Sequence, residues 1–209
     1  MARTKPFETH PHRYDHWFER HRFAYESELE AVRLHLPLER RGLEIGVGSG
    51  RFAAPLGIKF GLEPAQKMIE MARKRGICVA SGVAEALPFR NASFDFALMV
   101  TTICFLDDIN AAFKEVHRIL KPGGSLIIGF VDKNSSLGKL YQERKADNVF
   151  YQPATFFSVE EVVSFLLNTG FKDLKFTQTI FKNLSDIRSA EPVIPGHGQG
   201  SFVVIEAGR

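Results

Sequence analysis

Three glycines at alternate positions constrain this 209-residue chain more than any other feature. The segment Leu43-Glu44-Ile45-Gly46-Val47-Gly48-Ser49-Gly50 is a largely apolar run that ends in these glycines. Glycine adopts positive φ easily, and its missing Cβ lets a ligand approach main-chain N–H groups closely. The segment therefore predicts a strand followed by a ligand-binding turn. The alternative is a tight strand-to-helix turn that binds nothing.

The residues around the glycines indicate which ligand the turn would accept. A dinucleotide-binding turn has the pattern G-x-G-x-x-G, with the third glycine opening the helix that holds the pyrophosphate. Here the spacing is G-x-G-x-G, and Arg51 stands in the place of that third glycine. Glu44 lies two positions before Gly46, where its carboxylate would repel a pyrophosphate and attract a cation. The turn therefore favours a cationic ligand over a diphosphate.

A second acid ends the next predicted strand. Residues 58–63, Ile-Lys-Phe-Gly-Leu-Glu, have the pattern of a strand that ends in Glu63. In an open α/β sheet, ligands bind outside the carboxyl ends of the strands, at the switch point. A carboxylate there can accept hydrogen bonds from two ribose hydroxyls. The alternative is that Glu63 merely caps, or is solvated before, the helix that begins at Pro64.

The alternation of strand and helix patterns predicts the fold class. We expect a single α/β domain over residues 1–209, with a doubly wound, seven-stranded, mostly parallel (Rossmann-like) sheet, an antiparallel edge strand and a helical cap. A short helix should follow the glycine turn, and Lys121 to Gly124 should form a sharp turn. The predicted strands span 43–45, 58–63, 77–81, 94–100, 125–131, 171–180 and 202–207, and the main helices span 14–36, 64–75, 109–120 and 159–168.

Several segments, in this order, resemble the class I S-adenosylmethionine-dependent methyltransferases, in the small-molecule branch similar to methyltransferase type 11. The glycine turn resembles the first motif of that family. Residues 82–89 and the following Ser93-Phe94-Asp95 resemble its adenine loop, 120–124 its L-K-P-G-G turn, and 14–19 its aromatic N-terminal helix. Val83 departs from the pattern, because an acid usually stands there to meet the adenine amine. Glu85 or a backbone carbonyl would then take that role.

The resemblance implies an enzyme that uses S-adenosylmethionine, and it implies a set of site residues. The expected cofactor-binding residues are Tyr14, Glu44, Gly46, Gly48, Gly50, Glu63, Pro64, Met68, Ala84, Glu85 and Thr101. We expect the acceptor beside the aromatic side chains Trp17, Phe18, Phe105, Tyr141 and Tyr151. The N-terminal cap helix in 1–37 and the insertion at 132–170 should cover it. The aromatics of the N-terminal helix could equally pack on the core.

No catalytic residue is assigned from the sequence. A sulfonium is a good leaving group, so the protein mainly has to hold an acceptor in line with the methyl group and exclude water. A hydroxyl or a protonated amine would also need a general base. His16 and Tyr14 are candidates, although a histidine on this charged helix could simply lie at the surface. No cluster of His, Asp and Glu has ligand spacing, so no metal is expected.

The expected reaction is methyl transfer to a small-molecule acceptor by in-line displacement, on nitrogen or oxygen, with a small amine among the candidates. No Asn/Asp-Pro-Pro-Tyr motif follows the fourth strand, which argues against methylation of DNA bases. Two alternatives remain open. One is a nicotinamide-dependent oxidoreductase, and the other is a module that binds S-adenosylmethionine without turnover.

Charge and hydropathy limit the classes of partner that we expect for this chain. The net charge is +3 and the chain has no Lys/Arg block, so no nucleic-acid partner is expected. No run approaches the roughly 20 apolar residues of a membrane span, so no membrane partner is expected either. Cys78 and Cys104 lie in apolar runs, which predicts buried, reduced thiols and a cytoplasmic location. The sequence carries no signal for an oligomeric state.

Overall fold

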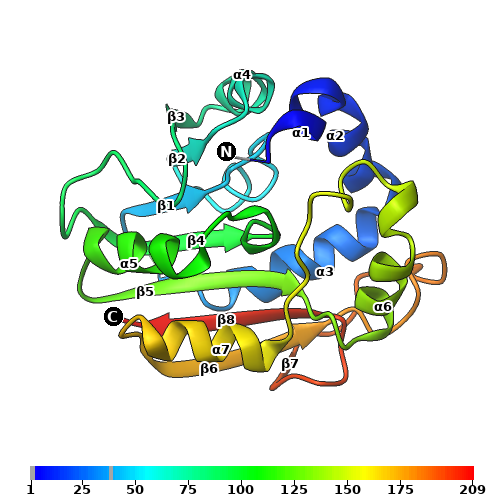
Figure 1. The fold of residues 1–209 in the computed structure, drawn as a ribbon. Helices are drawn as coiled ribbons and strands as arrows, with labels where there is room; N and C mark the ends of the chain where they lie inside the picture. Colours follow the sequence, from blue (N-terminus) through cyan, green and yellow to red (C-terminus); the bar gives the residue numbers. More distant parts are fainter. Residues whose placement is uncertain (1–2, 38–39) are drawn as a thin grey trace.

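The computed structural model describes residues 3–37 and 40–209, which fold around one twisted sheet (Figure 1). Its eight strands have the order β3-β2-β1-β4-β5-β8-β6-β7. The first five in sequence pair in parallel, whereas β8 is antiparallel to β5, and β6 and β7 continue that antiparallel edge. The strands are β1 (Gly42–Ile45), β2 (Phe60–Glu63), β3 (Cys78–Ser81), β4 (Phe94–Val100), β5 (Leu120–Val131), β6 (Lys172–Thr179), β7 (Ile194–Pro195) and β8 (Phe202–Gly208).

Helices cover both faces of the sheet. Because side chains alternate along a strand, β4 sends Ala97 and Met99 into one apolar cluster and Leu98 and Val100 into the other. Helices α5 and α7 close the first cluster, and α3 and α4 close the second. The helices are α1 (Lys5–Thr9), α2 (Pro11–Arg20), α3 (Arg22–Arg33), α4 (Gln66–Lys74), α5 (Ile109–Ile119), α6 (Ser136–Glu143) and α7 (Val159–Asn168), with 3-10 turns at Ile103–Phe105 and Lys145–Asp147.

The predicted doubly wound, mostly parallel sheet with an antiparallel edge is confirmed, with eight strands in place of seven because the short β7 pairs with β6. The helix predicted over 14–36 is wrong as one element. It breaks at His21 into α2 and α3, which lets α2 leave the sheet while α3 packs against β5, β6 and β8. The break carries no proline or glycine.

Three smaller predictions also fail. Residues 51–57 form turns and no helix. The Lys-Pro-Gly-Gly segment is the beginning of β5, where Leu120 pairs with Phe94 and a bulge separates that pair from the rest of the ladder. Cys78 is exposed, because it lies on β3 at the edge of the sheet, whereas Cys104 is half-buried.

The carboxyl ends of β1, β2, β4 and β5 point toward a cap formed by α1, α2, α6 and the segment that follows α6 (Figure 1). This arrangement gathers the predicted site residues at one edge of the sheet. Within the described part of the chain, no helix is both long enough and apolar enough to span a bilayer.

Candidate functional site

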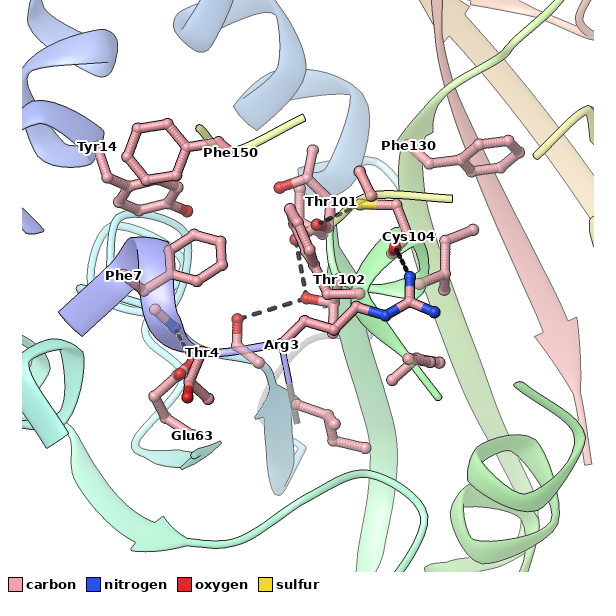
Figure 2. Close-up of a pocket in the computed structure, with 18 of the residues that line it drawn as sticks. Arg3, Thr4, Phe7, Tyr14, Glu63, Thr101, Thr102, Cys104, Phe130 and Phe150 are labelled. Atoms are coloured by element: carbon pink, nitrogen blue, oxygen red, sulfur yellow. Dashed lines mark hydrogen bonds between the residues drawn. The ribbon is translucent and has the colours of Figure 1, made fainter. Parts of the chain in front are cut away.

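A cavity of about 320 Å³ lies between the strand ends and the cap (Figure 2). Ile45, Glu63 and Val100 line its floor from β1, β2 and β4. Its roof comes from α1, α2 and the segment after α6, so residues more than 100 positions apart in the sequence face one another. A concave, mostly apolar space at the carboxyl edge of an α/β sheet is the usual place for a ligand.

The glycine turn forms one wall of the cavity. Gly46 and Gly48 have φ of +70° and +53°, and both line the cavity. A Cβ at Gly46 would lie 2.5 Å from the Thr102 side chain, and one at Gly48 would lie 3.3 Å from the Tyr14 hydroxyl. Both positions therefore need glycine for conformation, and Gly46 needs it for space as well. Gly50 also has positive φ, but it packs toward α4 and does not line the cavity.

Glu63 joins the end of β2 to the glycine turn. Its Oε2 accepts a hydrogen bond from the Gly48 N–H at 2.9 Å, and its Oε1 accepts one from the Ala65 N–H at 2.9 Å. Burial raises the pKa of Glu63 to about 7, and these two hydrogen bonds oppose the rise. The carboxylate is thus held rigidly at the cavity wall with lone pairs left for a ligand.

Glu44 lies behind the turn and does not line the cavity. Its side chain is buried, and among the described residues its Oε2 has no hydrogen-bond partner. Burial raises the pKa of Glu44 well above its usual range, and a hydrogen bond with the Ala53 backbone opposes this rise. Glu44 therefore does not contact a ligand in the cavity, and burial favours its uncharged form.

Helix α2 is tied to the glycine turn through Asp15. The Asp15 carboxylate accepts hydrogen bonds from Ser49 Oγ at 2.7 Å, Arg51 Nε at 2.8 Å and Arg75 Nη2 at 2.8 Å. Burial tends to raise the pKa of Asp15, but these partners lower it to about 2. Arg51, which replaces the third glycine of a dinucleotide turn, therefore holds α2 over the site. Sequence reasoning missed Asp15 and Arg75, because their link to the turn is long-range.

The two candidate bases are poorly suited to that role. Burial, and then the charges of Glu44 and Glu63, raise the pKa of Tyr14 far above its ordinary value, so its phenol stays protonated. His16 is exposed and does not line the cavity. Tyr14 instead contributes a hydroxyl beside Gly48 and a ring that faces Phe7 and Phe150 (Figure 2).

The predicted adenine loop lines the same cavity. Val83, Ala84 and Glu85 are at its wall, together with Pro64. Glu85 Oε1 accepts hydrogen bonds from the backbone N–H groups of Asp107, at 2.8 Å, and Asp108, at 3.3 Å, so this carboxylate fixes the loop after β4. Of the other expected cofactor residues, Thr101 lines the cavity, whereas Met68 is fully buried in the core outside it.

The opposite part of the cavity is aromatic. All five residues expected to bind the acceptor line it, namely Trp17, Phe18, Phe105, Tyr141 and Tyr151. Phe7 from α1 adds to them, with its ring centroid 5.1 Å from that of Phe105 and 5.5 Å from that of Phe150 (Figure 2). Sequence reasoning missed Phe7, although the Lys-Pro-Phe start of α1 is a helix signal.

The N-terminal segment is fastened on both sides of the cavity. The Arg3 Nη1 donates to the Pro153 carbonyl at 2.7 Å and to the Cys104 carbonyl at 3.2 Å (Figure 2). Glu8 accepts hydrogen bonds from the first N–H groups of α4, at Gln66 and at Lys67. Within the described residues, no group of three His, Cys, Asp or Glu could hold a metal ion.

Comparisons with known proteins agree with this geometry. A sequence profile described as "Methyltransferase domain" matches residues 43–128. A solved S-adenosylmethionine-dependent methyltransferase from Thermotoga maritima, described as a possible histamine N-methyltransferase, is 54% identical, with a TM-score of 0.96 over 98% of this chain and 99% of that one. An uncharacterized protein of Methanocaldococcus jannaschii is 44% identical over 96% of this chain and 97% of its own length.

A more distant structure shares the fold. Phosphoethanolamine N-methyltransferase 2 of Haemonchus contortus, solved with S-adenosylmethionine, is 18% identical, with a TM-score of 0.63 over 88% of this chain and 52% of that one.

The chain belongs to the class I S-adenosylmethionine-dependent methyltransferases. The predicted enzyme class and cofactor are thereby confirmed. The glycine turn, the buried orphan oxygen of Glu44 and the fixed Glu63 carboxylate fit a ligand that carries positive charge and ribose hydroxyls.

Proposed function

We propose that this enzyme transfers the methyl group of S-adenosylmethionine to a small amine held under the aromatic cap. The observation that carries this proposal is one continuous cavity, which has a rigid acid and a glycine turn at one end and aromatic rings at the other. The description of the Thermotoga maritima relative as a possible histamine N-methyltransferase supports an amine as the acceptor.

Each part of the cofactor end would have its own task. Glu63 would accept hydrogen bonds from the two ribose hydroxyls, since its carboxylate is already oriented by Gly48 and Ala65. Gly46 and Gly48 would let the ligand approach the main chain, and Val83 and Ala84 would pack on the adenine ring. A positive charge bound in front of the turn would favour the ionised form of Glu44 behind it. The bound cofactor supplies an activated methyl group and a neutral leaving group.

The cap would position the acceptor and exclude water. Trp17, Phe18, Tyr141 and Tyr151 provide flat apolar walls, and a walled cavity of this size suits a small molecule. Holding the acceptor nitrogen in line with the methyl group removes much of the entropic barrier to a reaction between two molecules. Within the predicted segments 1–37 and 132–170, we expect α1, α2, α6 and the stretch between α6 and α7 to form this cap, whereas α7 packs on the sheet. Residues 1–2 lie outside the described part of the chain.

Production of S-adenosylhomocysteine tests the proposal. Wild-type enzyme is incubated with S-adenosylmethionine and with histamine, tyramine or phenethylamine, and both products are quantified by mass spectrometry. We expect S-adenosylhomocysteine and the methylated amine in equal amounts. Turnover on RNA or protein alone would contradict the small-molecule acceptor. Tight binding of a nicotinamide dinucleotide without binding of S-adenosylmethionine would favour the oxidoreductase alternative, and cofactor binding without any turnover would favour a binding module.

A further inference from the structure

Glu28 is a buried acid in the cavity wall to which neither the fold nor the cofactor assigns a task. It lies in α3, on the same helix face as the buried Ala24, Ala31 and Val32, and only 4% of the residue is exposed. Glu28 also lines the cavity. Across residues 3–37 and 40–209, the structure gives its carboxylate no hydrogen bond and no ion pair.

A carboxylate in this position needs an explanation. Burying a charge without a partner is strongly unfavourable, and an apolar side chain at this helical position would pack at no such cost. Burial alone raises the pKa of Glu28 to about 8, with no hydrogen bond to oppose the rise. Glu63, also buried, is by contrast held by two backbone N–H groups. The Glu28 carboxylate can therefore form a hydrogen bond or an ion pair with a ligand that enters the cavity.

The residues around Glu28 indicate which kind of ligand would bind to it. Tyr14, Tyr141 and Tyr151 line the same cavity as Glu28. Burial chiefly raises the pKa of each of these phenols, and the charge of Glu28 adds a smaller contribution in the same direction. The rings of Tyr141 and Tyr151 stack with centroids 4.4 Å apart. An anion next to aromatic faces is the combination that binds an organic cation, because the ring faces are electron-rich.

The cations of the cavity do not neutralise Glu28. Arg3 donates to the carbonyls of Cys104 and Pro153, and it lies within 3.6 Å of Asp107. Arg13 and Arg20 are exposed on α2, at the rim of the cavity, where water screens their charge. A cationic ligand that enters the cavity would therefore pair with Glu28 and favour its ionised form, which offsets the effect of burial.

We propose that Glu28 is the specificity-determining residue for the acceptor, and that its carboxylate pairs with a protonated nitrogen of a small aromatic or aliphatic amine beside Tyr141 and Tyr151. This inference rests on the proposed function, because it assumes that the aromatic end of the cavity holds the acceptor. It assigns recognition to Glu28. Where the bound nitrogen itself receives the methyl group, the ammonium first gives its proton to the Glu28 carboxylate, because a protonated amine has no lone pair to attack the methyl group.

Calorimetric binding of matched ligand pairs tests the assignment. Phenethylamine is compared with 2-phenylethanol, and tyramine with tyrosol, each with S-adenosylhomocysteine present. Wild type should bind each amine more tightly than its alcohol. Glu28→Gln should weaken amine binding about 30-fold, which corresponds to about 2 kcal/mol, and leave alcohol binding within about twofold. Glu28→Asp should retain part of the preference for amines.

Two controls separate recognition from folding. Glu30→Gln makes the same chemical change at an exposed position of α3, where the Glu30 carboxylate lies 3.5 Å from Arg33 Nε, and it should bind amines as wild type does. Thermal unfolding of Glu28→Gln should show that the fold is intact. The affinity for S-adenosylmethionine should also stay within about twofold of wild type, because Glu63 and the glycine turn are untouched.

The outcomes distinguish this inference from the proposed function. A wild-type enzyme that binds amines no better than alcohols, or a Glu28→Gln variant that binds amines normally, would overturn the role of Glu28 and leave methyl transfer standing. Loss of S-adenosylmethionine affinity in Glu28→Gln would assign Glu28 to the cofactor instead. Wild-type binding of S-adenosylmethionine with no turnover on any acceptor would overturn the proposed function itself.

Discussion

The two ends of the cavity use their acids in opposite ways. At the proposed cofactor end, Glu63 is fixed by hydrogen bonds from Gly48 and Ala65, so its geometry is complete before any ligand arrives. At the proposed acceptor end, Glu28 is equally buried but has no such partners among the described residues. The proposed cofactor end thus depends on main-chain groups at strand ends, and the proposed acceptor end on side chains from separate helices.

This difference teaches how a shared fold can serve many acceptors. Backbone geometry at the strand ends is set by the sheet, so it tolerates little change. The aromatic end is assembled from α1, α2, α3 and the segment after β5, which can change without disturbing the sheet. Substitutions at the two ends should therefore separate cofactor binding, acceptor binding and stability.

The largest effect is expected from Glu63→Ala. The variant loses the proposed hydrogen bonds to the ribose and leaves the N–H groups of Gly48 and Ala65 without their acceptor. We expect S-adenosylmethionine to bind about 1,000-fold more weakly, or about 4 kcal/mol. Calorimetric titration measures this, with Glu70→Ala on the exposed face of α4 as the matched control. An unchanged affinity of Glu63→Ala for S-adenosylmethionine would show that the ribose does not bind to Glu63.

Gly46→Ala should have the next largest effect. The new Cβ would stand 2.5 Å from the Thr102 side chain at a φ of +70°. Gly57→Ala is the control, because Gly57 has a φ of +73° with no atom within 4 Å of an added Cβ. We expect the free energy of unfolding to fall by about 3 to 4 kcal/mol at Gly46 and by about 1 kcal/mol at Gly57. Equal losses in urea titrations would show that backbone strain alone matters.

Glu28→Gln should become more stable relative to wild type as the pH rises. The pKa of Glu28 is raised to about 8 in the folded protein, so the stability linked to its protonated form is present at low pH and is lost as pH rises toward 8. Glu28→Gln has no carboxyl group at this position, so it lacks this pH-dependent loss of stability. The difference in unfolding free energy between Glu28→Gln and wild type should grow by about 3.5 kcal/mol from pH 5 to pH 8. A difference that is constant with pH would mean that Glu28 is paired.

Asp15→Asn should have the smallest effect of the four, because part of its hydrogen bonding survives. We expect a loss of about 1 kcal/mol at pH 7 and a modest fall in S-adenosylmethionine affinity, since α2 carries Tyr14. The wild-type contribution is present above about pH 4 and is lost as pH falls toward the lowered pKa of about 2. Glu19→Gln removes a more exposed partner of Arg51 and serves as the control. An equal loss of stability in Asp15→Asn and Glu19→Gln would contradict the role of Asp15 in joining α2 to the glycine turn.

The sequence predicted the parts of the site that depend on local patterns. The glycine turn and Glu63 could be recognised because conformation and strand position are local properties. The tether from Asp15 to Arg51 and Arg75 could not, because it joins segments that only the fold brings together. The break at His21 likewise follows from packing of α3 on the sheet and has no glycine or proline to announce it.

Glu28 is a different kind of miss, because its signal was present. An acid at the spacing of Ala24, Ala31 and Val32 interrupts the apolar face of a helix, and such an interruption either finds a partner or serves a ligand. Distance along the chain hid the partner rings, since Tyr141 and Tyr151 come from a segment more than 100 residues later. The start of β5 at Leu120 was missed because proline and glycine normally end regular structure.

The most direct test is a crystal structure of the enzyme with S-adenosylhomocysteine and phenethylamine bound. The account predicts both ribose hydroxyls within hydrogen-bond distance of the Glu63 carboxylate, and the ammonium of the amine on Glu28. A ribose bound elsewhere, or the amino-acid end of S-adenosylhomocysteine seated on Glu28, would contradict it.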